Sequence, residues 1–107
     1  MNISLNYVES GTGDVLILLH GNSENYEIFK HQIDYFSSKY RVIAIDTRGH
    51  GNSPRGDAPF TLNQFAEDLN DFFLQHKISK ANILGFSDGG NIAMIFTMKY
   101  PEKVSKL

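Results

Sequence analysis

Residues 15–19 (VLILL) form a run of five apolar residues that ends directly in His20-Gly21-Asn22. A strand without polar alternation is buried on both faces, which is typical of a parallel sheet that helices cover on both sides. Residues 41–46 (RVIAID) and 80–86 (KANILGF) contain two further short apolar stretches. The sequence therefore predicts a parallel sheet built around these three strands.

An edge strand is expected around residues 3–7, where apolar and polar residues alternate before a glycine-rich turn at residues 11–14. Alternation of this kind is typical of a half-buried strand. The first helix is predicted over residues 26–38, which carry apolar side chains at helical spacing. Ser23 and Asn25, just upstream, are the candidate N-caps of this helix.

Two further helices are predicted later in the chain. Thr61 and Gln64 have the spacing of a capping box, and apolar residues recur at intervals of three and four over residues 62–73. Residues 91–100 are largely apolar, and Pro101 ends this helix because proline cannot continue it.

The alternation of strands and helices implies right-handed crossovers between parallel strands. The predicted fold class is therefore α/β, with a mainly parallel sheet of about four strands and helices on both faces. With 107 residues, 41% of them hydrophobic and 21% charged, the chain has the composition of one globular domain, residues 1–107.

Composition and charge exclude several classes of function. The formal charge of -2 comes from intermixed acids and bases, which favours a small-molecule partner over a nucleic acid or a membrane. The absence of cysteine excludes a disulfide framework and a thiolate nucleophile. No metal or organic cofactor is implied. The first ten residues lack the pattern of a signal peptide, so a cytoplasmic protein is expected.

A glycine-rich segment at the end of the third apolar strand has the pattern G-x-S-x-G. It reads Gly85-Phe86-Ser87-Asp88-Gly89-Gly90. In this pattern a strand turns sharply into a helix and holds the serine oxygen exposed in a strained conformation. Gly85 and Gly89 avoid collisions across the turn, and Gly90 is expected to let the helix press against neighbouring strands. Ser87 is the predicted nucleophile, with the N–H of Asp88 as an oxyanion donor.

Two upstream motifs complete a pattern of three. They are His20-Gly21-Asn22 after the first buried strand and Asp46-x-Arg48-Gly49-His50-Gly51-x-Ser53 after the second. In this combination the chain resembles the α/β-hydrolase superfamily over essentially its whole length. The resemblance implies that Ser87 attacks a carbonyl carbon. It also implies that the backbone N–H of Asn22 faces that of Asp88 as the second oxyanion donor.

Several of these residues also have a structural interpretation. Ser87, in a tight turn, is a candidate helix N-cap. The resemblance implies that His20 and His50 shape their loops and do not relay protons. Asp46 and Arg48 are a candidate ion pair that fixes the loop between them.

The resemblance implies that a catalytic acid and a histidine follow the serine in the chain. No histidine follows Ser87, and Glu102 is the only acidic residue there apart from Asp88. His31 and His76 fall on predicted helices, as solvated or core-edge side chains. The triad is therefore incomplete in these 107 residues, and the chain alone is expected to turn over substrate poorly or not at all.

The predicted fold is also incomplete, because the resemblance places the start of a further strand at residues 104–107. Members of the superfamily continue with more strands, a variable lid and covering helices. A parallel sheet with a bare edge or face is rarely stable in water. The chain is therefore expected to self-associate through the exposed edge or face of its sheet.

The leading hypothesis is the nucleophile half of an esterase-like serine hydrolase that works through an acyl-enzyme. The same elbow supports carbon–carbon bond hydrolysis, perhydrolysis or amide cleavage, which stay open as alternatives. Dehalogenase chemistry is disfavoured, because those relatives carry a carboxylate where this chain has Ser87. A non-catalytic module that binds a ligand or partner is the alternative from another class.

Overall fold

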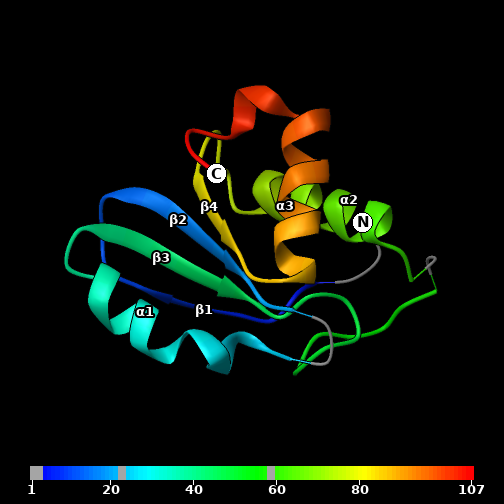
Figure 1. Cartoon of the computed structure of the whole chain (residues 1–107), viewed down its shortest axis with the longest axis horizontal. Helices are drawn as coiled ribbons and strands as arrows, with labels where there is room; N and C mark the ends of the chain where they lie inside the picture. Colours follow the sequence, from blue (N-terminus) through cyan, green and yellow to red (C-terminus); the bar gives the residue numbers. More distant parts are fainter. Residues whose placement is uncertain (1–3, 22–23, 58–59) are drawn as a thin grey trace.

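The computed structural model describes residues 4–21, 24–57 and 60–107. Its four-stranded sheet has the spatial order β1, β3, β2, β4 (Figure 1). The strands are β1 (Tyr7–Ser10), β2 (Asp14–Leu19), β3 (Tyr40–Ile45) and β4 (Asn82–Gly85). β2 pairs in parallel with both β3 and β4, whereas β1 pairs antiparallel with β3. The predicted mainly parallel sheet of four strands is confirmed, with β1 at its edge.

Helices cover both faces of this sheet, as predicted. On one face the 3-10 turn η1 (Tyr26–Phe29) leads into α1 (Lys30–Phe36). On the other face lie α2 (Leu62–Gln75) and α3 (Asp88–Lys99), packed against each other (Figure 1). A second 3-10 turn, η2 (Pro101–Lys103), follows α3 at the proline predicted to end it.

The unbroken apolar run of β2 is buried on both faces. Ile17 and Leu19 point toward α2 and α3, and Leu16 and Leu18 point toward α1. All four side chains are at most 8% exposed. Burial of a leucine or isoleucine side chain stabilises a fold by roughly 1.5–3 kcal/mol. β2 therefore contributes to two separate cores and fixes the centre of the sheet.

Two predicted helix caps are present. Asn25 caps η1, because its side-chain oxygen accepts the backbone N–H of Glu27 (2.9 Å). Ser23, the other candidate, lies outside the described residues. Thr61 caps α2 and accepts the Gln64 N–H (3.1 Å). The Gln64 side-chain amide donates to Asp68 Oδ1 (3.1 Å), one turn further into the helix.

Two element boundaries differ from the prediction. α3 begins at Asp88 and not near residue 91, because the glycines of the elbow continue directly into the first helical turn despite their weak helix propensity. β1 begins at Tyr7, where its pairing with Ile45 starts. Antiparallel pairing with β3, which residue alternation cannot reveal, sets this boundary.

The outer edge of β4 is partly covered. Ala81 forms a parallel bridge with Val104, Ser105 N–H donates to Ala81 O (2.8 Å), and Ile83 N–H donates to Lys106 O (2.9 Å). The backbone after η2 thus runs beside β4, where the resemblance places the next strand. Self-association through the sheet stays a prediction. Within the described part of the chain, no helix has the length and apolar character required to cross a membrane.

Candidate active site

The turn between β4 and α3 holds its serine in an unusual conformation. β4 ends at Gly85 and α3 begins at Asp88, so Phe86 and Ser87 alone make the connection. Ser87 has φ 57° and ψ −119°, a combination that costs a non-glycine residue about 1–3 kcal/mol. Its side chain is exposed and makes no capping hydrogen bond to α3. Ser87 thus occupies the N-cap position without acting as a cap.

Two of the elbow glycines are required by close backbone contacts. A Cβ on Gly85 would lie 2.4 Å from the carbonyl oxygen of Gly89, and a Cβ on Gly89 would lie 2.1 Å from Leu19 O and 2.7 Å from His20 O. No side chain fits at such distances. At Gly90 the nearest atom to a Cβ would be 3.5 Å away, an ordinary contact. The expectation that Gly90 is needed for close packing is therefore wrong.

His20 joins the loop after β2 to the loop after β3. It is 1% exposed, and its Nε2 accepts the backbone N–H of Thr47 (3.0 Å). The ring proton therefore lies on Nδ1, which is 2.6 Å from Gly21 O and donates to it. Burial lowers the pKa of His20, the bond to Gly21 opposes this shift, and His50 lowers the pKa further. His20 is accordingly held as a neutral bridge between two backbone segments.

His50 is held within its own loop. Its Nδ1 lies 3.1 Å from both Thr47 Oγ1 and Arg48 O. The His50 ring stacks on the ring of Phe60, with 5.8 Å between their centroids. The guanidinium of Arg55 lies over the same Phe60 ring, 4.4 Å from its centroid. The His50 ring is therefore held by hydrogen bonds to Thr47 and Arg48 and by stacking on Phe60.

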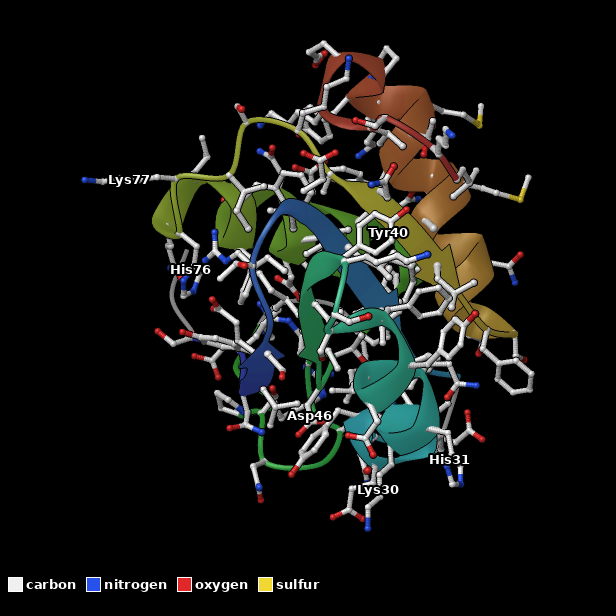
Figure 2. All side chains as sticks on the ribbon, turned by 90° about the vertical axis from the view of Figure 1, so that its left-hand side faces the viewer. Lys30, His31, Tyr40, Asp46, His76 and Lys77 are labelled. Carbon is white, nitrogen blue, oxygen red and sulfur yellow. The ribbon has the colours of Figure 1, made fainter. Side chains whose placement is uncertain are left out.

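Asp46 organises the loop that follows β3. Its Oδ1 accepts Tyr26 N–H (2.8 Å), and its Oδ2 accepts the Asn6 side-chain amide (2.9 Å) and Asn52 N–H (3.0 Å). A Cβ on Gly51 would lie 2.3 Å from Asp46 Oδ2. The absence of a side chain at Gly51 therefore leaves room for the Asp46 carboxylate. Figure 2 places Asp46 below the sheet ends, close to the α1 side.

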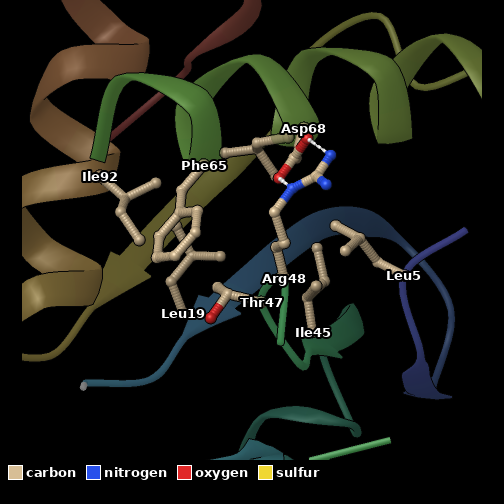
Figure 3. Close-up of a pocket in the computed structure, with 9 residues that line it drawn as sticks. Leu5, Leu19, Ile45, Thr47, Arg48, Phe65, Asp68 and Ile92 are labelled. Carbon is tan, nitrogen blue, oxygen red and sulfur yellow. Dashed lines mark hydrogen bonds and ion pairs between the residues drawn. The ribbon is translucent and has the colours of Figure 1, made fainter. Parts of the chain in front are cut away.

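Arg48 forms a buried ion pair with α2. Its Nε and Nη2 donate to the two carboxylate oxygens of Asp68, both at 2.8 Å, and Nη1 donates to Arg55 O (2.9 Å). Figure 3 shows the two contacts between these side chains. Both charged side chains are 1% exposed. The bond to Asp68 raises the pKa of Arg48. The predicted pairing of Arg48 with Asp46 is therefore wrong, because backbone N–H groups and an amide already surround Asp46.

Asp68 was not among the predicted site residues, although the sequence carries a signal for it. Asp68 lies at helical spacing between Phe65 and Phe72, on the buried face of α2. A carboxylate in such a stripe is almost always paired. The ion pair borders a cavity of about 10 Å³ between the sheet and α2 (Figure 3), a volume on the scale of one water molecule.

The remaining histidines lie on opposite sides of the sheet. Figure 2 places His31 on α1 and His76 at the end of α2. His31 is exposed. The ring of His76 packs against Phe72 (4.1 Å between centroids) and Tyr7 (4.9 Å). They match the solvated and core-edge positions expected of them.

Two further residues belong to the loop after β2. Asn22, the predicted second oxyanion donor, lies outside the described residues. Glu24 was not predicted to contribute, yet its Oε1 accepts the backbone N–H of Gly21 (2.9 Å). A glutamate three residues after a His-Gly pair offers only a weak signal of such a bond. Among the described residues of this loop, the elbow and the first turn of α3, Ser87 carries an exposed hydroxyl.

A family model described as alpha/beta hydrolase fold matches residues 14–107. Among curated proteins, epoxide hydrolase 4 of Mus musculus is 34% identical, over 98% of this chain and 30% of the relative. The 3-oxoadipate enol-lactonase 2 of Acinetobacter baylyi is 32% identical, over 99% of this chain and 40% of the relative.

Solved structures give the same picture. A marine microorganism esterase superposes with a TM-score of 0.94 and 34% identity, covering 99% of this chain and 41% of that protein. An epoxide hydrolase from Bacillus megaterium superposes with a TM-score of 0.92 and 29% identity, covering 98% of this chain and 38% of that protein. The chain spans 30% to 40% of the length of the two curated relatives.

Proposed function

The chain belongs to the alpha/beta hydrolase fold family, and from this membership we propose that it carries the nucleophile and oxyanion donors of a serine hydrolase. The substrate is a small ester or related carbonyl compound, cleaved through an acyl-enzyme in the cytoplasm. The observation that carries the proposal is the conformation of Ser87, which is strained, exposed and without a capping bond. A strained backbone conformation persists only where the surrounding structure holds the residue in it, and such residues cluster at active sites.

In the proposed reaction, Ser87 Oγ attacks the carbonyl carbon and its proton passes to a general base. The negative charge on the carbonyl oxygen is stabilised by the backbone N–H groups of Asp88 and Asn22 and by the N-terminal end of α3. Collapse expels the alcohol, which takes up the proton, and leaves an acyl ester on Ser87. Water then releases the acid. No residue is assigned as that base, because no histidine follows Ser87 in these 107 residues.

A serine at the elbow also favours one substrate class among those that the relatives' names suggest. Attack of a serine oxygen on an epoxide would give an ether, which water does not cleave under mild conditions. Attack on an ester or lactone gives an acyl ester, which water does cleave. The proposal therefore favours acyl compounds, as in the esterase and the enol-lactonase, over epoxides.

A fluorophosphonate probe tests the proposal, applied to the complete polypeptide in which this sequence occurs. Intact-mass analysis should find one adduct, located at Ser87 by peptide mapping, and Ser87→Ala should remove both the adduct and esterase activity. Ser79→Ala, at another exposed serine, is the matched control and should change neither. Adduct formation that survives Ser87→Ala would refute the assignment. No adduct in the folded complete polypeptide would instead favour a non-catalytic binding module.

A further inference from the structure

Asp88 carries a carboxylate directly beside the candidate nucleophile. It follows Ser87 as the first residue of α3, and it is half-buried. Within the described residues, no ion pair or hydrogen bond involves this carboxylate, and no buried side-chain nitrogen or oxygen lacks a partner. The carboxylate oxygens of Asp88 therefore reach the solvent, where a ligand can bind them.

Three other acids of this region already have partners within the protein. Glu24 Oε1 accepts a backbone N–H (2.9 Å), and Asp46 accepts three hydrogen bonds. Asp68 is paired with Arg48, and both of these side chains are 1% exposed. The guanidinium of Arg48 is therefore bonded to another carboxylate. Asp88 differs from these acids, because its charge has no partner within the described residues.

Asp88 lies against the loops that follow β2 and β3. Together with Gly21 and His50, it lines a cavity of about 10 Å³. A Cβ on Gly21 would be 3.2 Å from Ser87 Cβ, so Ser87 lies against the same turn. Consecutive Cα atoms are only about 3.8 Å apart. A group bound to Ser87 therefore lies at a distance from the Asp88 carboxylate that is comparable with the Debye length, about 8 Å at physiological ionic strength.

We propose that the Asp88 carboxylate selects the substrate by charge and favours acyl groups that carry a protonated amine near the scissile carbonyl. This inference rests on the proposed function. Aspartates that reach the solvent are ionised at neutral pH. A cationic acyl group is attracted to such a carboxylate, whereas an anionic acyl group is repelled. The preferred substrates are therefore esters of amino acids, and esters of dicarboxylic acids are disfavoured.

The charge of Asp88 also acts on the transition state. In the proposed reaction the backbone N–H of Asp88 binds the oxyanion, so negative charge develops near this carboxylate. The two negative charges repel each other, and a positive charge on the acyl group offsets the repulsion. A cationic substrate is therefore favoured in kcat/KM, which measures the stabilisation of the transition state relative to free enzyme and substrate.

The position of Asp88 also has a purely structural interpretation. An acid in the first turn of a helix stabilises that helix through its dipole. This contribution is the same whichever substrate is bound. Discrimination between substrates of opposite charge therefore separates the proposed role from the structural one.

Three ethyl esters with acyl groups of similar length test the inference in the complete polypeptide: β-alanine ethyl ester (cationic), ethyl butyrate (neutral) and monoethyl succinate (anionic). Measured by ethanol release, kcat/KM for the cationic ester should exceed that for the anionic ester by about tenfold or more, with the neutral ester between them. Asp88→Asn retains the shape of the side chain and should reduce this ratio about tenfold. Asp34→Asn, at an exposed acid on α1, is the matched control and should leave the ratio unchanged.

A second measurement needs no variant and stays informative if Asp88→Asn fails to fold. Raising the NaCl concentration from about 0.05 M to about 0.5 M should reduce the wild-type ratio several-fold, because salt screens the carboxylate. A ratio that ignores salt, or one that folded Asp88→Asn leaves unchanged, would overturn the inference. Failure of the proposed function has a different signature, because either none of the three esters is hydrolysed or their hydrolysis survives Ser87→Ala.

Discussion

The two loops at the carboxyl end of the sheet are held in opposite ways. The loop after β3 is held by buried polar side chains, among them Asp46 with three hydrogen bonds and Arg48 with an ion pair. The elbow after β4 is held by contacts between backbones, which Gly85 and Gly89 permit, and the side chain of Ser87 is exposed.

This difference teaches where each loop is vulnerable. Removal of a side chain damages the loop after β3, because its polar partners remain buried without their hydrogen bonds. Addition of a side chain at Gly85 or Gly89 damages the elbow, because no space exists there for a Cβ. The hydroxyl of Ser87 contributes neither to packing nor to a helix cap, so it is available to react. The following variants test this contrast, from the largest expected effect to the smallest.

Arg48→Met should lower the free energy of unfolding by about 3–5 kcal/mol, because the Asp68 carboxylate would remain buried without its partner. Urea denaturation of the complete polypeptide measures this loss. Lys99→Met breaks an exposed ion pair with Glu67 and should cost no more than about 1 kcal/mol. The double variant Arg48→Met/Asp68→Leu should recover much of the loss. Equal effects of the buried and exposed variants would contradict the first half of the comparison.

Gly89→Ala should destabilise the protein by about 1–3 kcal/mol, because the new methyl group would overlap Leu19 O. Gly90→Ala is the matched variant, one position further along α3. It should stabilise the protein by about 0.5–1 kcal/mol, because alanine has the higher helix propensity and the nearest atom is 3.5 Å away. Thermal denaturation of both variants measures whether each substitution raises or lowers the stability. A destabilising Gly90→Ala would show that the elbow is tighter than its contacts indicate.

The stability contributed by His20 should fall as the pH is lowered. Burial lowers the pKa of His20 in the folded protein below its ordinary value of 6.5. Below pH 6.5 the unfolded chain therefore binds a proton that the folded chain does not, and stability falls until the pH reaches the lowered pKa of the folded state. Urea midpoints above and below pH 6.5 measure this slope. His20→Gln removes the titrating group, and an unchanged slope in that variant would exclude His20 as its source.

Much of the fold was predictable, because burial leaves a pattern in the chain. Residues 15–19 lack polar alternation since both faces of β2 are covered, and residues 62–73 carry the stripe that α2 presents to the sheet. The start of α3 was less accessible. Asp88 and two glycines begin it with weak helix formers, so the backbone contacts that hold this turn leave no periodic signal.

The candidate site was predictable only where a motif names the residue. The conformation of Ser87 follows from the spacing of its glycines. The partner of Arg48 does not, because Asp68 lies 20 residues away on another element. Proximity in sequence suggested Asp46, but pairing in a folded chain depends on which groups remain unsatisfied. Glu24 was missed because its bond is to backbone, which every residue possesses.

The three bonds of Asp46 also bear on the order in which the molecule assembles. Their donors come from residues 40 positions before it, 20 positions before it and six positions after it. Bringing together residues 20 and 40 positions apart costs more chain entropy than closing the six-residue contact. We therefore expect the loop beside the candidate nucleophile to reach its final shape only once β1, η1 and β3 are together.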